Sequence, residues 1–316
     1  MYMRAVFLLL ILVLAVQPVS FAQYKTSYTV AADGTGEYTS IQAVLNACKS
    51  FPDQRIQIHL KPGVYKEKIE IFSWTTRISL LGQNADSTII TFDDHAGKGN
   101  NSTFTTYTFK VMGDDFYAEN ITFENAAGRV GQAVALHVEA DRCTFRNCKF
   151  KGNQDTIYAA GAGSRQYFID CYIDGTTDFI FGAATAIFQN CEIRSKQNSF
   201  VTAASTPQDQ PFGYVFLKCK LTAEPDVDKV FLGRPWRNYA RTVYIDCTFG
   251  AHIRPEGWQN WGRKEAESTA YYGEYKNTGP GYQPASRVPW AHNLTAKEAK
   301  GYTLANIFRD WDGQPR

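Results

Sequence analysis

Five short stretches repeat one pattern: FRNCKF at 145–150, FIDCYI at 168–173, FQNCEI at 188–193, FLKCKL at 216–221 and YIDCTF at 244–249. Each stretch begins with an aromatic residue, places a cysteine three positions later and ends on an apolar or aromatic residue. The intervals between successive cysteines run from 20 to 28 residues. A β-rich unit that recurs at such a period is typical of a solenoid.

The repeat therefore predicts an all-β fold, a right-handed parallel β-helix whose consecutive coils lie about 4.8 Å apart. Segments rich in glycine, asparagine and aspartate, such as KGNQD, AGAGS and DGTTD, are expected at the corners. A β-sandwich is the alternative, but it would not repeat one residue type at one phase. Short capping helices are expected at both ends, one within 33–50 behind Ser40 and one over 293–308 from Thr295, each covering an open β-edge.

The repeated cysteines have two explanations. All seven cysteines of the chain lie beyond residue 22, and they do not form a Cys-x-x-Cys zinc motif. They could form a buried ladder of small apolar side chains. In an exported protein, neighbouring coils would also bring two cysteines within bonding distance. Cys171 and Cys191 are the expected disulfide, and no metal site or cofactor is expected.

The N-terminus predicts export. Arg4 precedes an apolar run over 5–16, and Ser20-Phe21-Ala22 supplies a small-residue cleavage pattern. We therefore expect a signal peptide over 1–22, cleavage after Ala22, and a secreted or periplasmic protein in which 23–316 form one domain. The apolar run is short for a membrane anchor. The net charge of +2 favours neither a nucleic-acid nor a membrane partner, and a monomer is expected.

Two aspartates share one phase of the repeat. Asp155 lies seven residues after Cys148, and Asp178 lies seven after Cys171. On consecutive coils their Cα atoms would be about one β-spacing apart. Two carboxyl groups that close do not both ionise readily, so one is expected to stay protonated beside an ionised partner. Turn or cap positions are the alternative for a single aspartate, and Asp170 is assigned to such a position.

A stacked carboxyl pair does not by itself name a reaction. A retaining glycosidase places two carboxyl groups about 5 Å apart. An ester hydrolase can instead use an aspartate as its nucleophile. A carbohydrate-binding solenoid without catalysis would have no need of the pair. The surrounding residues must discriminate between these functions.

Several motifs resemble those of the pectin methylesterase family. They are GNQDTIY at 152–158, TTDFIFG at 176–182, LGRPW at 232–236 and GQAVALHVEADRCTFRNC at 131–148. The resemblance extends to ADGTGEYTSIQAVLNA near the start and YYGEYKNTGPG near the end, so it covers nearly all of 23–316. The departures from the family pattern are Asn153 in place of an aromatic residue, Ile157, Thr177, and QNSFVTAASTP at 197–207 in place of an ITAQGR-like stretch.

The resemblance implies an aspartyl esterase mechanism without a cofactor. Asp178 would attack the methyl-ester carbonyl of a galacturonate, and Asp155 would serve first as general acid and then as general base. Arg234 would hold Asp178 ionised. The amides of Gln132 and Gln154 would stabilise the oxyanion, although corner residues that bond the backbone are the alternative for both.

The resemblance also implies the substrate and the walls of the groove. Methyl-esterified homogalacturonan would be demethylated to methanol and pectate, with Trp236, Tyr158 and Phe181 lining the groove. By strict alternation Phe179 and Phe181 share one face, so one of them could belong to the core. A different ester as substrate, or a β-helix lyase or glycosidase that cuts pectin, remains the alternative.

Overall fold

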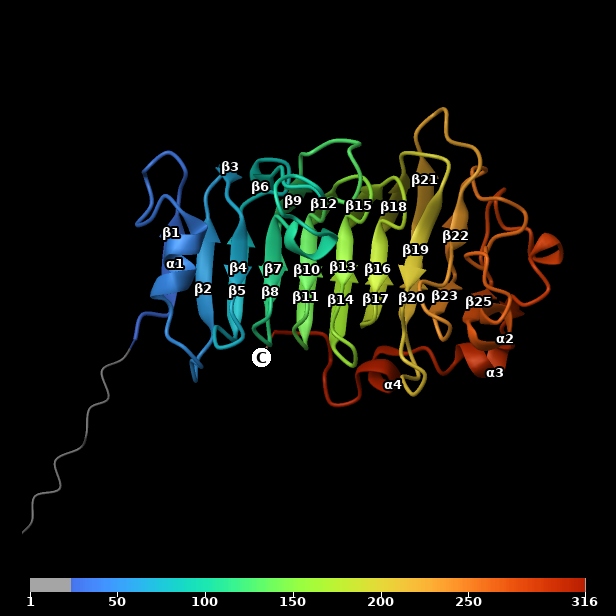
Figure 1. The fold of residues 1–316 in the computed structure, drawn as a ribbon. Coiled ribbons are helices and arrows are strands. Elements are labelled where there is room, and N and C mark those ends of the chain that lie inside the picture. Colours follow the sequence, from blue (N-terminus) through green and yellow to red (C-terminus); the bar gives the residue numbers. More distant parts are fainter. Residues whose placement is uncertain (1–23, 316) are drawn as a thin grey trace, which may run out of the picture.

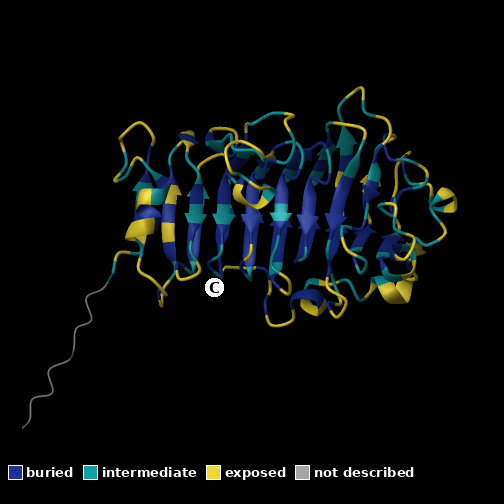
Figure 2. Ribbon diagram, viewed as in Figure 1, coloured by how far each residue is buried: buried dark blue, intermediate teal, exposed yellow. Residues whose placement is uncertain are grey.

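A computed structural model describes residues 24–315, whose strands form a parallel β-helix of three sheets (Figure 1). Each complete coil gives one strand to each sheet, and every strand pairing is parallel; β10 with β13 is one example. The interior of the coils is buried, and most exposed residues lie in the connections (Figure 2). The β-helix predicted from the cysteine repeat is confirmed.

The long sheet contains, in spatial order, β1 (Ser27–Val30), β2 (Ile56–Leu60), β5 (Ile78–Gly82), β8 (Tyr117–Glu119), β11 (Cys143–Arg146), β14 (Arg165–Ile169), β17 (Thr185–Gln189), β20 (Tyr214–Leu217), β23 (Arg241–Ile245), β25 (Tyr271–Tyr275) and β26 (His292–Asn293). The eight-stranded sheet contains β24 (Thr248–Phe249), β21 (Lys220–Ala223), β18 (Glu192–Ser195), β15 (Tyr172–Gly175), β12 (Lys149–Lys151), β9 (Thr122–Asn125), β6 (Thr88–Phe92) and β3 (Gly63–Lys66). The seven-stranded sheet contains β22 (Phe231–Gly233), β19 (Phe200–Ala204), β16 (Ile180–Gly182), β13 (Ile157–Ala159), β10 (Leu136–Val138), β7 (Phe109–Val111) and β4 (Ile69–Ile71).

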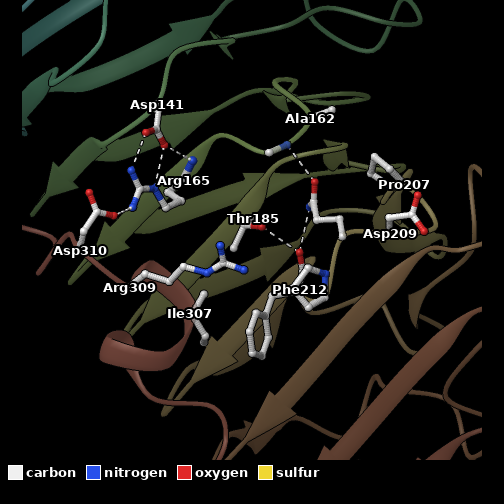
Figure 3. A pocket seen from close by; sticks show the side chains of 13 residues that line it. Asp141, Ala162, Arg165, Thr185, Pro207, Asp209, Phe212, Ile307, Arg309 and Asp310 are labelled. Carbon is white, nitrogen blue, oxygen red and sulfur yellow. Dashed lines mark hydrogen bonds and ion pairs between the residues drawn. The ribbon is translucent and has the colours of Figure 1, made fainter.

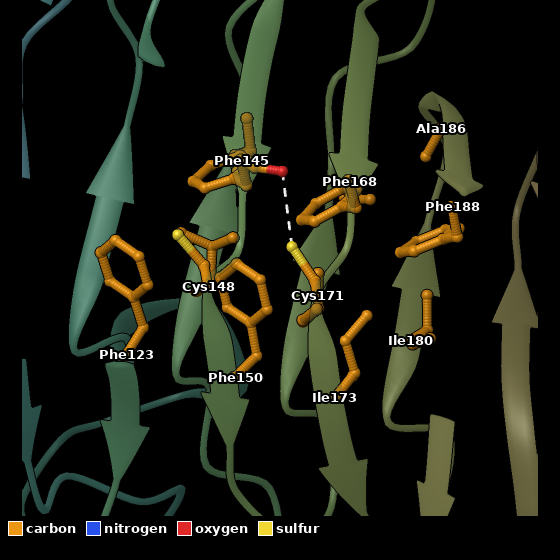
Figure 4. Packing of buried hydrophobic residues seen from close by; sticks show 14 of the residues in the cluster. Phe123, Phe145, Cys148, Phe150, Phe168, Cys171, Ile173, Ile180, Ala186 and Phe188 are labelled. Carbon is orange, nitrogen blue, oxygen red and sulfur yellow. Dashed lines mark hydrogen bonds between the residues drawn. The ribbon is translucent and has the colours of Figure 1, made fainter. Parts of the chain in front are cut away.

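The corner before each repeated cysteine explains the sequence pattern. Its residue has a left-handed backbone conformation, with φ between 47° and 55° at Asn147, Asp170, Asn190, Lys218 and Asp246. This corner interrupts strict alternation, so the aromatic residue before it and the cysteine after it both point inward. The aromatic residues stack along the interior, with ring centroids 4.4 to 4.9 Å apart from β11 to β23. Figure 4 shows part of this column.

The expected disulfide between Cys171 and Cys191 is not formed, and that prediction is wrong: all seven cysteines are free thiols. The stacked cysteines leave consecutive coils in the same direction. Each thiol therefore donates to a carbonyl oxygen of the coil before it. Cys171 donates to Phe145 at 3.4 Å (Figure 4), and Cys191 donates to Phe168 at 3.5 Å. The alternative of a buried thiol ladder holds.

The first capping helix follows the prediction. Helix α1 (Ile41–Ala47) has Ser40 as its N-cap, and the Ser40 hydroxyl accepts a hydrogen bond from the backbone N–H of Ala43. Its Ile41, Val44 and Leu45 side chains are buried in the main core, where the helix contacts β1 and β4. The helix thereby covers the N-terminal end of the β-helix.

The C-terminal segment differs from the prediction. Two helices, α3 (Ala296–Ala299) and α4 (Leu304–Phe308), replace the single helix expected over 293–308, and Gly301 lies between them. Helix α4 does not cover the last coil. Its Ile307 and Phe308 pack on an outward-facing apolar row of the long sheet, formed by Tyr167, Ile187 and Val215.

The outward-facing row is apolar, and α4 removes it from water by packing over the middle coils. Figure 1 shows the red C-terminal segment running back beneath the strands to the region of β11. Thr144 on β11 donates its hydroxyl to the carbonyl oxygen of Gly313 at 2.8 Å. Arg165 on β14 donates to the carbonyl oxygen of Phe308 at 2.6 Å. The remaining helical turns are α2 (Ala266–Thr269), η1 (Thr103–Thr105) and η2 (Pro284–Ser286).

The signal peptide predicted over 1–22 lies outside the described residues. Between residues 24 and 315, no helix has both the length and the apolar character needed to cross a membrane.

Candidate active site

Asp155 and Asp178 occupy equivalent positions of consecutive coils. Strands β13 and β16 pair with Ile157 opposite Ile180, and each aspartate lies two residues before its strand. The seven-residue offset in the sequence predicts this placement. Both aspartates have a left-handed backbone, with φ of 68° at Asp155 and 50° at Asp178. Other corners of the coils, such as those at Asn147 and Asp170, share this conformation, so the backbone alone does not distinguish the two aspartates.

Arg234 binds Asp178 through two parallel hydrogen bonds. Its Nε donates to Oδ1 at 3.0 Å, and its Nη2 donates to Oδ2 at 2.7 Å. Arg234 follows β22, where its backbone N–H donates to the carbonyl oxygen of Thr202 on β19. This two-point contact between a guanidinium and a carboxylate fixes the plane of the nucleophile candidate and favours its ionised form.

Asp155 has a different environment. It is buried, and its carboxyl group makes no hydrogen bond or ion pair with another residue of 24–315. Burial, followed by the charge of Asp178, raises the pKa of Asp155 well above its ordinary value. Burial also raises the pKa of Asp178, but the hydrogen bonds and the charge of Arg234 oppose that rise. The site therefore favours a protonated Asp155 beside an ionised Asp178.

Gln132 and Gln154 present free amide groups to the same cleft. Their backbones form a parallel bridge that brings the two side chains together from consecutive coils. Neither side-chain amide hydrogen-bonds to another residue within the described part of the chain, which disfavours the alternative of corner residues that bond the backbone. Both line the cleft that holds the aspartates. They can therefore donate to an oxygen of a bound ligand.

Aromatic side chains form the wall of the cleft. Phe181 and Trp236 line the cleft as predicted, but Tyr158 does not. Tyr158 is opposite Phe181 in the register of β13 and β16, and its ring stacks on that of Phe181 at 4.5 Å. Trp236 lies 5.8 Å from Phe181, and the exposed Phe104 lies 5.3 Å from Tyr158. Flat apolar faces beside polar donors suit a sugar ring. The cleft has a volume of about 200 Å³.

Phe179 and Phe181 do not share one face, contrary to the alternation argument. Phe179 is fully buried and packs in the main core, whereas Phe181 lies on the outer face with Tyr158. The left-handed backbone of Asp178 precedes Phe179, and regular alternation begins only at Ile180. Phe181 is therefore the groove residue of the two.

His137 packs against Tyr158. Its ring lies 4.6 Å from that of Tyr158, and its Nε2 lies 3.0 Å from Oε1 of Glu139. Burial lowers the pKa of His137 to about 4. The imidazole is not part of the cleft lining and is neutral near pH 7, so His137 has a structural role here.

Sequence reasoning missed three aromatic residues of this region: Phe104, Phe200 and Trp261. Phe104 and Trp261 line the cleft, and Phe200 packs behind Arg234. Phe200 belongs to the stretch at 197–207 that departs from the family pattern, and that departure is the one signal that could have drawn attention to it. Phe104 lies in the turn η1, far from any repeated motif.

A larger hollow, of about 580 Å³, lies on the long-sheet side between the C-terminal segment and two connections (Figure 3). Arg165 is already held there by Asp141 and Asp310. The aspartate cleft is the smaller of these two hollows, and it contains the buried carboxyl pair beside free donors. The described residues contain no group of three or more His, Cys, Asp or Glu side chains arranged to hold a metal ion.

Together the fold and the cleft define a parallel β-helix protein with an arginine-supported carboxyl pair in an aromatic groove. The family profile described as Pectinesterase matches residues 27–310. The chain belongs to this family.

Three known proteins illustrate the similarity. Pectinesterase 31 of Arabidopsis thaliana is 39% identical over 292 residues, which cover 89% of this chain and 91% of that protein. Probable pectinesterase/pectinesterase inhibitor 6 of the same plant is 42% identical over 296 residues, covering 90% of this chain but 52% of that protein. This chain thus spans about half the length of that relative. The solved pectin methylesterase from carrot superposes with a TM-score of 0.84 at 36% identity, over 89% of this chain and 92% of that one.

Proposed function

We propose that the chain is a pectin methylesterase that hydrolyses the methyl esters of galacturonate units in homogalacturonan and releases methanol and pectate. The observation that carries this proposal is the contrast within the carboxyl pair. Asp178 is held by two hydrogen bonds from Arg234, while Asp155 is buried without a cationic partner. One carboxyl group is thereby prepared to attack and the other to give up a proton.

In the first half of the reaction, an Oδ atom of Asp178 attacks the carbonyl carbon of the ester. The amides of Gln132 and Gln154 donate hydrogen bonds to the oxygen that becomes negative. The bond between the carbonyl carbon and the methoxy oxygen then breaks, and Asp155 transfers its proton to that oxygen. Methanol leaves, and the galacturonate remains joined to Asp178 as an acyl-enzyme anhydride.

In the second half, the ionised Asp155 removes a proton from a water molecule that attacks the acyl carbon. The anhydride bond breaks, which restores the Asp178 carboxylate and leaves a free carboxylic acid on the sugar. Asp155 is again protonated, so the cycle closes without a cofactor. Arg234 remains bound to Asp178 in the resting state at both ends of the cycle.

A paired measurement tests this function. Purified protein is incubated with highly methylated pectin, and methanol, viscosity and reducing ends are followed in one sample. We expect methanol and acid to appear with no early fall in viscosity. A fall in viscosity with new reducing ends or unsaturated products, without methanol, would instead identify a depolymerising β-helix enzyme. Parallel assays on acetylated and other methylated substrates test for a different ester.

We also propose that the protein is exported as a monomer after removal of residues 1–22. The support is the sequence pattern that ends at Ala22. N-terminal sequencing of protein recovered outside the cell should begin at Gln23. Size-exclusion chromatography with light scattering should give the mass of one chain.

A further inference from the structure

Both faces of the Arg234 guanidinium are covered by aromatic rings. The Cζ atom lies 3.6 Å from the ring centroid of Trp261 and 3.9 Å from that of Phe200. Two rings this close to one atom cannot occupy the same face without colliding, so they lie on opposite faces. A guanidinium between two rings is attracted to both of them and cannot rotate out of its plane without losing these contacts.

The stack continues beyond Phe200. Phe200 on β19 and Phe231 on β22 are opposite each other in the strand register, and their rings are nearly parallel at 5.3 Å. The Cζ of Arg254 lies 4.8 Å from the ring of Phe231, and Arg254 is in turn hydrogen-bonded to Glu256. We call this column the arginine stack: Trp261, Arg234, Phe200, Phe231 and Arg254.

Phe200 supports Arg234 without forming part of the cleft. It is not among the residues that line the cleft, and its ring contacts the guanidinium rather than the space next to the aspartates. Trp261, by contrast, lines the cleft and could contact a ligand directly. A change at Phe200 can therefore reach the carboxyl pair only through Arg234.

We infer that Phe200 is a positioning residue that fixes the plane of Arg234 and thereby sets the ionisation of Asp178. This inference rests on the proposed esterase function. Without the Phe200 ring, the guanidinium can turn about its terminal torsions, and the two parallel hydrogen bonds to Asp178 are held less well. Because those bonds oppose the effect of burial, their loss shifts Asp178 toward its protonated, unreactive form.

The test compares Phe200→Leu, which removes the ring but stays apolar, with Phe200→Tyr, which keeps it. On methylated pectin, Phe200→Leu should lower kcat roughly 2- to 30-fold, the range that one cation–π contact spans. KM should change less than about twofold, because the cleft lining is intact. The acidic limb of the pH profile should move to higher pH. Phe200→Tyr should keep the wild-type kcat and the wild-type position of the acidic limb.

Phe212→Leu is the matched control. Phe212 is also half-buried and in contact with an aromatic ring, Tyr302 at 5.6 Å, but it packs on the long-sheet side away from Arg234. Its variant should keep the wild-type pH profile. If Phe200→Leu fails to fold, Phe231→Leu is measured instead, since it withdraws the ring behind Phe200. The acidic limb should then shift in the same direction by a smaller amount.

A folded Phe200→Leu variant with wild-type kcat and an unmoved acidic limb would overturn the inference. So would a Phe200→Tyr variant as impaired as Phe200→Leu. If the wild-type protein releases no methanol, the proposed function fails. The role of Phe200 is then tested by a measurement that does not depend on activity. The pKa of the Asp178 carboxyl group, followed by NMR, should still rise in Phe200→Leu, and an unchanged pKa would refute the role of Phe200.

Discussion

Asp178 and Arg234 lie 56 residues apart in the chain, yet they meet through two parallel hydrogen bonds of 3.0 and 2.7 Å. The coil geometry makes this possible: Asp178 precedes β16, Arg234 follows β22, and β19 lies between these strands in the seven-stranded sheet. The pair thus joins opposite ends of strands in different coils. A lysine in place of Arg234 could supply the charge but not the two-point contact.

Arg234→Lys should therefore lower kcat strongly while leaving the protein folded. One of two charge-assisted hydrogen bonds is lost, and such bonds are worth about 1.5–3 kcal/mol each, so a fall of roughly tenfold to 100-fold is expected. Steady-state methanol release measures the change. Arg237→Lys is the control, because Arg237 is exposed and does not contact Asp178. Equal losses in the two variants would contradict the assigned contact.

Asp178→Asn should abolish methanol release, because a neutral amide cannot form the acyl-enzyme. The variant should fold but melt below the wild-type temperature, since Arg234 loses the charge of its carboxylate partner. Asp170→Asn provides the comparison: Asp170 has a similar left-handed backbone at an exposed corner, and two equivalent corners already carry asparagine. Asp170→Asn should retain full activity. Wild-type rates in Asp178→Asn would remove the nucleophile assignment.

Asp155 should make stability fall as the pH rises. Its pKa is raised in the folded protein, so the native state binds more protons than the unfolded state above the ordinary aspartate pKa of about 3.9. Stability is therefore lost upward from about pH 4. Asp155→Asn should raise the melting temperature by an amount that grows as the pH rises above about 4, until Asp155 ionises in the folded protein. Calorimetry across that range tests this, and a constant difference would be inconsistent with the raised pKa.

The pH dependence of kcat/KM should be bell-shaped. Activity requires an ionised Asp178, which sets the acidic limb, and a protonated Asp155, which sets the alkaline limb. The two apparent pKa values belong to the coupled pair rather than to either residue. Activity that stays level well above neutral pH would argue against Asp155 as the acid.

Gln154→Ala should remove one donor to the oxyanion, with a fall in kcat of about 10²–10³ and little change in KM. Gln132→Ala should act in the same direction. Gln189→Ala is the control, because Gln189 lies on the outer face of the long sheet, where it accepts a hydrogen bond from Tyr167. A change confined to KM in the Gln154 variant would assign that side chain to ground-state binding instead.

Lys218→Asn should stabilise the protein slightly. Lys218 occupies the left-handed corner, with φ of 54°, that Asn147 and Asn190 occupy in other coils. Asparagine tolerates this conformation better than lysine, so a gain of up to about 1 kcal/mol is expected. Chemical denaturation should show a higher midpoint with an unchanged slope. Lys220→Asn, on the neighbouring strand β21, should bring no such gain.

The coil architecture and the carboxyl pair were predictable because both follow from residue spacing: the interval between the repeated cysteines, and the offset of each aspartate from its cysteine. The cysteine repeat sets the phase, and Asp155 and Asp178 share it. The state of Cys171 and Cys191 was not predictable in this way, since it depends on which direction stacked side chains take. The positions of α4, Phe104 and Trp261 depend on connections outside the repeat, whose paths leave no periodic signal.

The fold-back of the C-terminal segment has a consequence for unfolding. A solenoid with contacts only between neighbouring coils can open from one end, coil by coil. Here the chain end is anchored on β11 and β14, many coils before the last one, through Thr144 and Arg165. Because the C-terminal segment continues from the last coils and bonds to the middle ones, the last coils cannot unfold fully while those bonds remain. We therefore expect the coils to unfold together in one cooperative transition.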